Sequence, residues 1–390
     1  GRKDPKVAGK WPQRSFRAVT GSSKREMQFQ IGKGFATLNM GEKRSSLVLG
    51  GVGPRHWFEG DSPMGDSSLD SVFVAIKELQ KKLYSEGIEM IHYERTDPNE
   101  TWGYIFFNFD ESIIKDLVED RCSSKLFLVV FEGKVISPEN WSASNHALFD
   151  VVFTWDRNEL PDTPKPEYFQ YLLPNDLDER VRTIPFRERD KLCVMVASNK
   201  YQNRSGELYS ERYKAIQWFR KNRPDDFDLY GPGWDKPEKK FGYKIRNLRR
   251  IILGKQPRYK EVNPVYRGIA ASKKHTISRY KFCICFENAE NQPGYITEKI
   301  FDCFLSGVVP VYLGWDRADS LIPEETFIDR RRFKDYGELY SFLAGISEEE
   351  FYRYINAARE FIESPQGKSF GIEPFVEIIA KNLKGFVGDQ

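Results

Sequence analysis

The feature that most constrains the fold of this chain is a repeated alternation of apolar runs with helical patterns. In the first alternation, apolar runs that predict strands occur at 88–91, 103–109, 126–131 and 151–155. Apolar residues at helical spacing predict helices at 68–86 and 112–118. Strands that alternate with helices are typical of a parallel sheet covered by helices. We therefore predict an α/β domain in this part of the chain.

The same alternation resumes further along the chain. The predicted strands lie at 192–197, 227–230, 282–286 and 308–313. The predicted helices lie at 211–221, 297–306, 336–343 and 348–363. The sequence thus predicts two similar α/β halves.

The stretch between the two halves predicts a linker. Residues 160–190 contain five prolines and many charges, which break periodic structure. A chain of 390 residues also exceeds the roughly 250 to 300 residues that one core supports. We divide the chain into an irregular N-terminal extension (1–58), an N-terminal α/β domain (59–159), a linker (160–190), a C-terminal α/β domain (191–366), and a C-terminal helix and tail (367–390).

The extension contains one clear apolar run, at 47–49, which continues as Gly50-Gly51-Val52-Gly53-Pro54. A phosphate-binding loop would open an amphipathic helix. Pro54 and the polar residues after it open none, so we interpret the glycine-rich segment as a turn.

Charge excludes one class of function. Sixty Lys and Arg against 57 Asp and Glu leave a net charge of +3, too small for nucleic-acid binding over the whole molecule. The stretch 236–260, with Arg246, Arg249 and Arg250, is strongly basic. A solvated helical face is favoured there over a patch for an anionic partner.

Neither metal nor disulfide chemistry is indicated. The number of cysteines is odd, and Cys283 and Cys285 lie too close in an apolar run to bridge. The four histidines, at 56, 92, 146 and 275, show no ligand spacing. Two Asp-x-Asp tripeptides, at 176–178 and 226–228, could be proposed as metal clamps, but chance in acidic surface stretches is favoured.

No window approaches the roughly 20 apolar residues of a membrane span, and no secretory leader opens the chain. We therefore expect no transmembrane segment and a cytoplasmic location. The sequons at Asn99, Asn140 and Asn203 are then attributed to chance.

The segment 280–314 is the most informative for function, because it predicts a strand, a polar loop, a helix and a strand. Thr297 to Lys299 fall at the helix start, where free N–H groups and the helix dipole favour a phosphate. Lys299 can add a full charge to a diphosphate, and Glu298 can accept hydrogen bonds from sugar or ribose hydroxyls. The alternative is that Thr297 caps the helix and the two charges are ordinary first-turn residues.

This segment resembles the α1,3/4-fucosyltransferase family. The family combines a Phe-Glu-Asn core, a Tyr-Ile-Thr-Glu-Lys element and a Gly-x-Val-Pro-Val run, which occur here in this order at 286–288, 295–299 and 307–311. The resemblance is close at 280–314 and looser at 192–233, and the first 120 residues do not match. Ala289 stands where the family has Ser, and the loop 291–294 is unusual for the family.

The resemblance implies a GT-B fold, in which two Rossmann-like domains face each other across a cleft. The C-terminal domain would hold GDP-fucose and the N-terminal domain the acceptor. Asn288, Tyr295, Glu298 and Lys299 would contact the donor, with Lys299 and Tyr295 near the diphosphate.

A second family element is a Ser-Asn pair followed by an Arg that opens a helix and approaches the diphosphate. Ser198, Asn199 and Arg212 are similar to it, and Arg204 is the competing candidate. Arg suits this role because its planar fork holds two phosphate oxygens. The alternative for Arg212 is a surface residue paired with an acidic neighbour.

The family also uses a carboxylate after an apolar strand as the base. Glu132 is similar to it, and Glu139 is the runner-up. Burial at a strand end can raise the pKa of a carboxyl group and make it an effective base near neutral pH. The alternative is an exposed turn residue beside Gly133.

The combined hypothesis is an inverting, metal-independent transfer of L-fucose from GDP-fucose to a glycan hydroxyl, forming an α linkage, α1,3 in the family. No cofactor is required in this reading. Glu132 would deprotonate the acceptor, and Lys299 with Arg212 would stabilise the leaving diphosphate. The alternatives are a GT-B transferase of another nucleotide sugar, and a carbohydrate-binding protein without turnover.

Overall fold

The structure is a computed structural model of the chain. It describes residues 27–31, 34–38, 47–59, 70–119, 124–158, 161, 163–178, 184–189, 191–235 and 264–387. The basic stretch 236–260 lies outside the described residues, as does Cys122.

Residues 1–46 and 47–390 form two separate units. In the first unit, strands β1 (Met27–Ile31) and β2 (Gly34–Leu38) pair antiparallel as a hairpin. The sequence predicts an irregular extension here and does not indicate this hairpin.

The N-terminal half of the second unit contains a parallel sheet of six strands in the order β4-β3-β5-β6-β7-β8. The strands are β3 (Leu47–Val52), β4 (Ile88–His92), β5 (Thr101–Phe107), β6 (Lys125–Val129), β7 (Val151–Thr154) and β8 (Glu167–Gln170). Its helices are α1 (Asp70–Ser85), α2 (Glu111–Glu119) and the short α3 (Ala143–His146).

Strand β3 corrects the predicted extension 1–58 and the predicted turn, because Gly50 and Gly51 continue the strand. The two glycines leave room for aromatic rings. A Cβ on Gly50 would lie 2.4 Å from the Tyr104 ring, and one on Gly51 would lie 2.1 Å from the Phe58 ring. Glycine in a strand interior often marks such close approach.

Strand β8 corrects the predicted linker 160–190. It lies at the edge of the sheet, directly after Pro164 and Pro166. An edge strand tolerates neighbouring prolines because only one side of it pairs. The prolines therefore mark the entry to a strand in this position.

The C-terminal half contains a parallel sheet of five strands in the order β10-β9-β11-β12-β13. The strands are β9 (Lys191–Val196), β10 (Phe227–Tyr230), β11 (Tyr280–Ile284), β12 (Val309–Tyr312) and β13 (Ile328–Asp329). The helices are α4 (Tyr209–Asn222), α6 (Lys273–Ile277), α7 (Glu298–Leu305), α8 (Tyr336–Gly345) and α9 (Glu348–Glu363). The prediction of two Rossmann-like α/β halves is confirmed.

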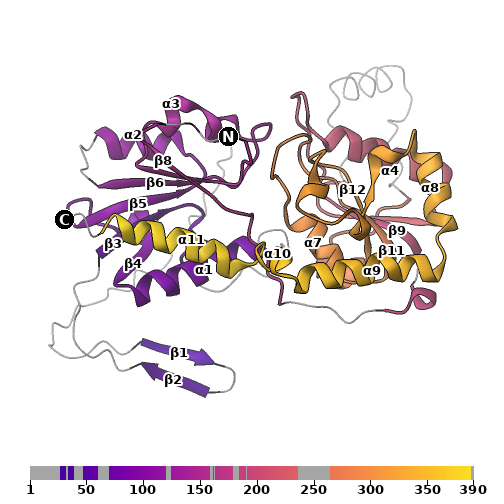
Figure 1. The fold of residues 1–390 in the computed structure, drawn as a ribbon, viewed down its shortest axis with the longest axis horizontal. Coiled ribbons are helices and arrows are strands. Elements are labelled where there is room, and N and C mark those ends of the chain that lie inside the picture. The colour runs from indigo at the N-terminus through magenta and orange to yellow at the C-terminus, as the bar shows by residue number, and fades with distance from the viewer. Residues whose placement is uncertain are drawn as a thin grey trace, which may run out of the picture. The chain divides into compact units, whose positions relative to one another are not determined.

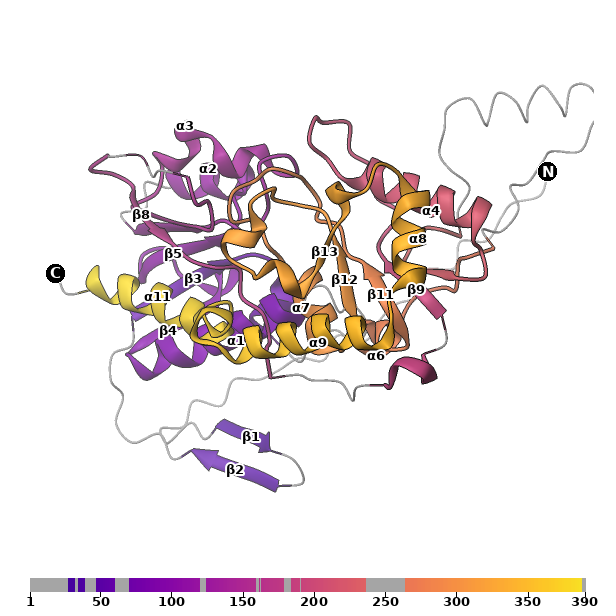
Figure 2. The ribbon, with the colours of Figure 1, turned by 45° about the vertical axis from the view of Figure 1, so that its right-hand side comes forward.

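The end of the chain returns to the N-terminal half. After α10 (Pro365–Lys368), helix α11 (Ile372–Gly385) lies beside α1, as both Figure 1 and Figure 2 show. Phe375, Ile379 and Leu383 of α11 are buried in one apolar core with Leu79 and Leu83 of α1. The last helix is therefore part of the N-terminal half.

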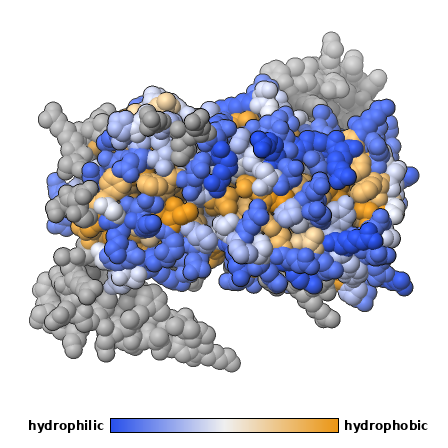
Figure 3. All heavy atoms as spheres, viewed as in Figure 1, coloured by the Kyte–Doolittle hydropathy of each residue, from blue (hydrophilic) through white to orange (hydrophobic). Residues whose placement is uncertain are grey.

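The described surface is mainly hydrophilic on the face seen in Figure 3, with smaller apolar areas among the charged ones. Large exposed apolar side chains, such as Tyr84, Tyr201 and Phe342, lie on different elements. Within the described residues, none of the helices has the length and apolar character needed to span a bilayer.

The first prediction tests the return of α11. Ile379 is fully buried, so Ile379→Ala should lower the free energy of unfolding by about 2–5 kcal/mol through lost burial and a residual cavity. Lys381→Ala, on the exposed face of the same helix, should change it by less than about 0.5 kcal/mol. Urea unfolding of both variants measures the difference, and equal effects would contradict the docking of this helix.

Candidate active site

A cavity of about 530 Å³ lies where the ends of several strands meet. Asn108 and Glu132, which follow β5 and β6, line it from the N-terminal half. Ser198 after β9 and Asn288 after β11 line it from the C-terminal half. These are carboxyl ends of parallel strands, where ligands bind in open α/β sheets.

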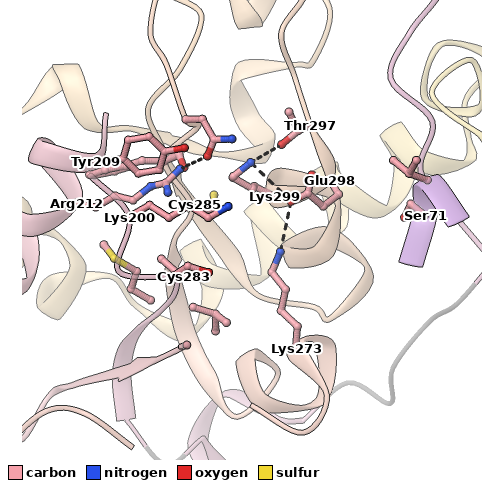
Figure 4. Close-up of a pocket in the computed structure, with 18 of the residues that line it drawn as sticks. Ser71, Lys200, Tyr209, Arg212, Lys273, Cys283, Cys285, Thr297, Glu298 and Lys299 are labelled. Carbon is pink, nitrogen blue, oxygen red and sulfur yellow. Dashed lines mark hydrogen bonds and ion pairs between the residues drawn. The ribbon is translucent and has the colours of Figure 1, made fainter. Parts of the chain in front are cut away.

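Lys299 lies in the first turn of α7, at the wall of this cavity (Figure 4). Its Nζ lies 3.0 Å from Oε2 of Glu287 and donates to Oγ1 of Thr297 at 2.9 Å. Burial opposes the positive charge, but Glu287 and Glu298 outweigh it and raise the pKa of Lys299. The ammonium group therefore stays charged at neutral pH.

Glu298 lies beside it in a buried charge cluster. Lys273 Nζ lies 2.6 Å from Oδ2 of Asp302 and 3.8 Å from Oε1 of Glu298, as Figure 4 shows in part. Burial alone would raise the pKa of Glu298, but the ammonium groups of Lys299 and Lys273 lower it below its ordinary value. Glu298 is therefore an ionised hydrogen-bond acceptor in the cavity wall.

Arg212, in the first turn of α4, also faces the cavity. Its Nη2 donates to the carbonyl of Phe286 at 2.7 Å and to Oδ1 of Asn288 at 2.9 Å, and its guanidinium lies 5.0 Å from the Tyr209 ring centroid. The competing candidate Arg204 is exposed and donates to the carbonyls at 135 and 136, away from the cavity. The structure thus brings Arg212, and not Arg204, to the other predicted residues.

Of the predicted pair Ser198 and Asn199, only Ser198 lies at the cavity. Ser198 lines the cavity, whereas Asn199 is exposed and donates from Nδ2 to the carbonyl of Gly233 at 2.9 Å. Asn199 also donates its backbone N–H to Pro232. It holds the loop after β10 and does not line the cavity, in contrast to the predicted contact with the donor.

Tyr295 connects the two sides of the cavity. Its ring packs 4.8 Å from that of Trp155 in the N-terminal half. Its hydroxyl lies 3.5 Å from Oε2 of Glu132, to which it donates, and accepts from Nδ2 of Asn288 at the same distance. A residue of the predicted donor site therefore touches the predicted base.

Glu132 is partly buried at the cavity, whereas Glu139 is exposed in the 3-10 helix Pro138–Trp141. Burial raises the pKa of Glu132, and the charges of Lys299 and Lys200 offset only part of that effect. A carboxylate with a raised pKa beside a cavity is suited to accept a proton near neutral pH.

Sequence reasoning missed two charged residues of the site. The Phe-Glu-Asn core contains Glu287 without indicating its role, yet this residue is fully buried and pairs with Lys299. Lys273 lies on the short helix α6, in a region where the sequence predicted no element. A carboxylate directly after the apolar run 282–286 was the available signal for Glu287, because a charge that continues a buried run requires a partner.

The structure shows no metal constellation in the part of the chain that it describes. The two Asp-x-Asp tripeptides have other contacts. Asp226 accepts from Tyr340, and Asp228 pairs with Lys191 and Arg267. Asp176 accepts the backbone N–H of Asp178, so neither tripeptide is assembled into the cavity wall.

The family profile that matches this chain covers the C-terminal half of the site. Residues 186–365 match the profile described as "Glycosyltransferase family 10 (fucosyltransferase) C-term". The chain is 33% identical over 72 residues to "Alpha-(1,3)-fucosyltransferase FucT" of Helicobacter pylori, covering 18% of this chain and 15% of that protein. It is 35% identical over 82 residues to "Alpha-(1,3)-fucosyltransferase 7" of Homo sapiens, covering 20% of this chain and 24% of that protein. The matched segments thus span less than a quarter of either relative.

Solved structures agree with the fold. Sucrose-phosphate synthase from Thermosynechococcus elongatus superposes with a TM-score of 0.54 at 10% identity, covering 88% of this chain and 100% of that one. Anabaena Alr3699/HepE in complex with UDP-glucose superposes with a TM-score of 0.50 at 11% identity, covering 87% and 99%. The prediction of a GT-B arrangement is confirmed at the level of the fold.

The second prediction follows from the raised pKa of Glu132. The folded protein holds the proton of Glu132 more tightly than the unfolded chain, so this stabilisation is present below the ordinary carboxyl pKa of 4.5. It is lost as pH rises through the folded-state pKa. Glu132→Gln has no such loss, so its free energy of unfolding should rise relative to the wild type as pH rises from the ordinary carboxyl pKa through the folded-state pKa of Glu132.

Chemical denaturation at several pH values measures this difference. Glu139→Gln removes one exposed carboxylate and controls for the change in net charge. A relative stability of Glu132→Gln that falls with pH would contradict the burial of this carboxyl group.

Proposed function

We propose, on the premise that the C-terminal domain of this chain belongs to glycosyltransferase family 10, that the protein transfers L-fucose from GDP-fucose to a hydroxyl of a glycan in an α1,3 linkage. The observation that carries the proposal is one cavity with a carboxylate base on one side and two cations on the other. Glu132 supplies the base, and Lys299 and Arg212 supply the cations.

The donor would lie against the C-terminal half. The free N–H groups at the start of α7 and the charge of Lys299 favour a diphosphate there. Arg212 adds a guanidinium whose Nη2 is held by protein oxygens, which fixes the direction of the group. Glu298, ionised and at the cavity wall, would accept hydrogen bonds from ribose or sugar hydroxyls.

The reaction would proceed by a single displacement. Glu132 takes the proton of the acceptor hydroxyl, and the hydroxyl oxygen forms a bond to the anomeric carbon. The bond from this carbon to the diphosphate oxygen breaks on the opposite face, and GDP leaves with the electron pair. Lys299 and Arg212 stabilise the negative charge that develops on the diphosphate. The configuration at the anomeric carbon is inverted.

The proposal is tested with a panel of GDP-fucose, GDP-mannose and UDP-galactose against a glycan array, with mass spectrometry of the products. We expect the mass of one deoxyhexose to be added with GDP-fucose. Transfer from another sugar nucleotide would show that this nucleotide, and not GDP-fucose, is the donor. Binding of glycans without transfer from any donor would favour a carbohydrate-binding protein.

The third prediction concerns the base. Glu132→Gln should lower kcat by a factor of about 10² to 10⁴, because a positioned base contributes that much, while GDP binding stays unchanged. Glu139→Gln is the matched control and should have little effect, since Glu139 is exposed outside the cavity. A loss of turnover in Glu139→Gln with normal turnover in Glu132→Gln would transfer the role to Glu139.

The fourth prediction concerns the diphosphate. Lys299→Ala should weaken GDP binding by roughly 1.5 to 3 kcal/mol, the contribution of a hydrogen bond to a charged group. Lys221→Ala removes an exposed Lys at the end of α4 and should leave the affinity unchanged. Calorimetry measures both, and equal affinities for the two variants would remove Lys299 from the donor site.

The fifth prediction concerns metal ions. Cationic side chains and a helix start can stabilise a leaving diphosphate without a metal. Fucosyl transfer should therefore persist in EDTA. Loss of transfer on chelation and its recovery with manganese would show that a metal takes part.

A further inference from the structure

The segment that contains Glu132 is held by an unusual asparagine, Asn108, at the carboxyl end of β5. Asn108 has a φ of 73°, and the only other non-glycine residue with positive φ in the described part of the chain is Asn291. Asparagine is one of the few residue types that adopt this left-handed conformation at low cost. The conformation turns the chain at the strand end, where Asn108 lines the cavity.

The side chain of Asn108 binds the backbone of the neighbouring strand end. Its Oδ1 accepts the N–H of Phe131 at 2.9 Å and that of Glu132 at 3.0 Å. The carbonyl of Glu132 accepts the indole N–H of Trp141 at 3.0 Å. Both backbone polar groups of Glu132 are thus fixed by side chains from other segments.

The side chain of Asn108 is itself held by that of Asn140. Fully buried Asn140 donates from Nδ2 to Oδ1 of Asn108 at 2.9 Å, and its own Oδ1 accepts the N–H of Phe109 at 2.7 Å. The carbonyl of Asn140 lies 2.6 Å from Nε2 of His146, so the imidazole carries its proton there. This network resists displacement of Oδ1 of Asn108, because hydrogen bonds are stronger in a low-dielectric interior.

The carboxylate of Glu132 has little support of its own. In the described residues its one hydrogen bond is the 3.5 Å contact from Tyr295. Its position therefore depends on the backbone at 131–132, and that backbone depends on Asn108. The geometry points to Asn108 as a positioning residue that holds Glu132 at the place where it accepts the acceptor proton, an inference that rests on the proposed function.

Two variants separate positioning from stability. Asn108→Gly keeps the left-handed backbone, which glycine adopts freely, and removes the acceptor oxygen. It should lower kcat by about 10-fold to 100-fold, with the KM for GDP-fucose unchanged, because displacement of a reacting group by about 1 Å has effects of this size. Asn108→Asp keeps an oxygen for all three hydrogen bonds and should retain most of the turnover at high pH.

Asn108→Asp has a second readout. The new negative charge lies next to the Glu132 backbone and raises the pKa of the base, so the acid limb of kcat/KM should move to higher pH. The groups whose charges act on Glu132 are Lys299, Lys200 and Glu298, with Tyr295 in contact, and all of them stay in place. Asn222→Asp, exposed at the end of α4, is the control and should not move the limb.

A double-mutant cycle decides whether Asn108 acts through Glu132. In the Glu132→Gln background, Asn108→Gly should lower the residual kcat by less than about twofold, because there is no base left to position. The same loss in both backgrounds, or a wild-type kcat in Asn108→Gly, would overturn the inference. A loss of GDP affinity in Asn108→Gly that equals its loss of turnover would also overturn it.

The result for Asn108 can be told apart from the result for the proposed function. If the wild type transfers no fucose, the proposed function fails before any variant is compared. If the wild type transfers fucose and the cycle shows equal losses, only the role of Asn108 fails. Thermal unfolding of each variant shows whether it is folded, and Asn108→Asp supplies the test if Asn108→Gly unfolds.

Discussion

The site depends on the burial of one carboxylate, Glu287, at the end of β11. A buried charge is costly unless it is paired and hydrogen-bonded. Glu287 accepts the N–H and the hydroxyl of Thr297 at 2.9 and 2.8 Å and pairs with Lys299 at 3.0 Å. These bonds fix Thr297, the residue before α7, whose own side chain caps no N–H of the helix. Space for it comes from Gly314, where a Cβ would lie 2.7 Å from Cγ of Glu287.

The two halves meet through the loop that departs from the family pattern. Gln292 accepts the N–H of Lys134 at 2.8 Å, and the carbonyl of Pro293 accepts the N–H of Arg157 at 3.0 Å. Gly294 has a φ of 87°, and a Cβ there would lie 2.4 Å from the carbonyl of Trp155. The loop 291–294 thus fits this chain's own N-terminal half and brings Tyr295 to Glu132.

The sequence predicted what depends on local pattern and on short motifs. Periodicity indicated the strands and helices of both sheets, and the start of α7 fixed Lys299 and Glu298 in the cavity wall. Periodicity did not indicate the strand β3. Its glycines are typical of a turn, and only the structure shows that they make room for the rings of Tyr104 and Phe58. Nor did periodicity indicate that α11 returns to α1, since an amphipathic helix does not specify its partner. Asn199 shows the same limit, because its direction depends on Gly233, a residue distant in sequence.

The charges of the cavity explain how several cations are held in its wall. Three cations and three carboxylates are gathered at the start of α7, namely Arg212, Lys273, Lys299, Glu287, Glu298 and Asp302. Without the carboxylates, the cations would repel one another in a buried site and would lose their charge or turn to solvent. With them, Lys299 stays protonated and its position is fixed by two oxygens. Under the proposed function, this arrangement would be preorganised for a diphosphate, and little reorganisation would be needed when negative charge develops on the leaving group.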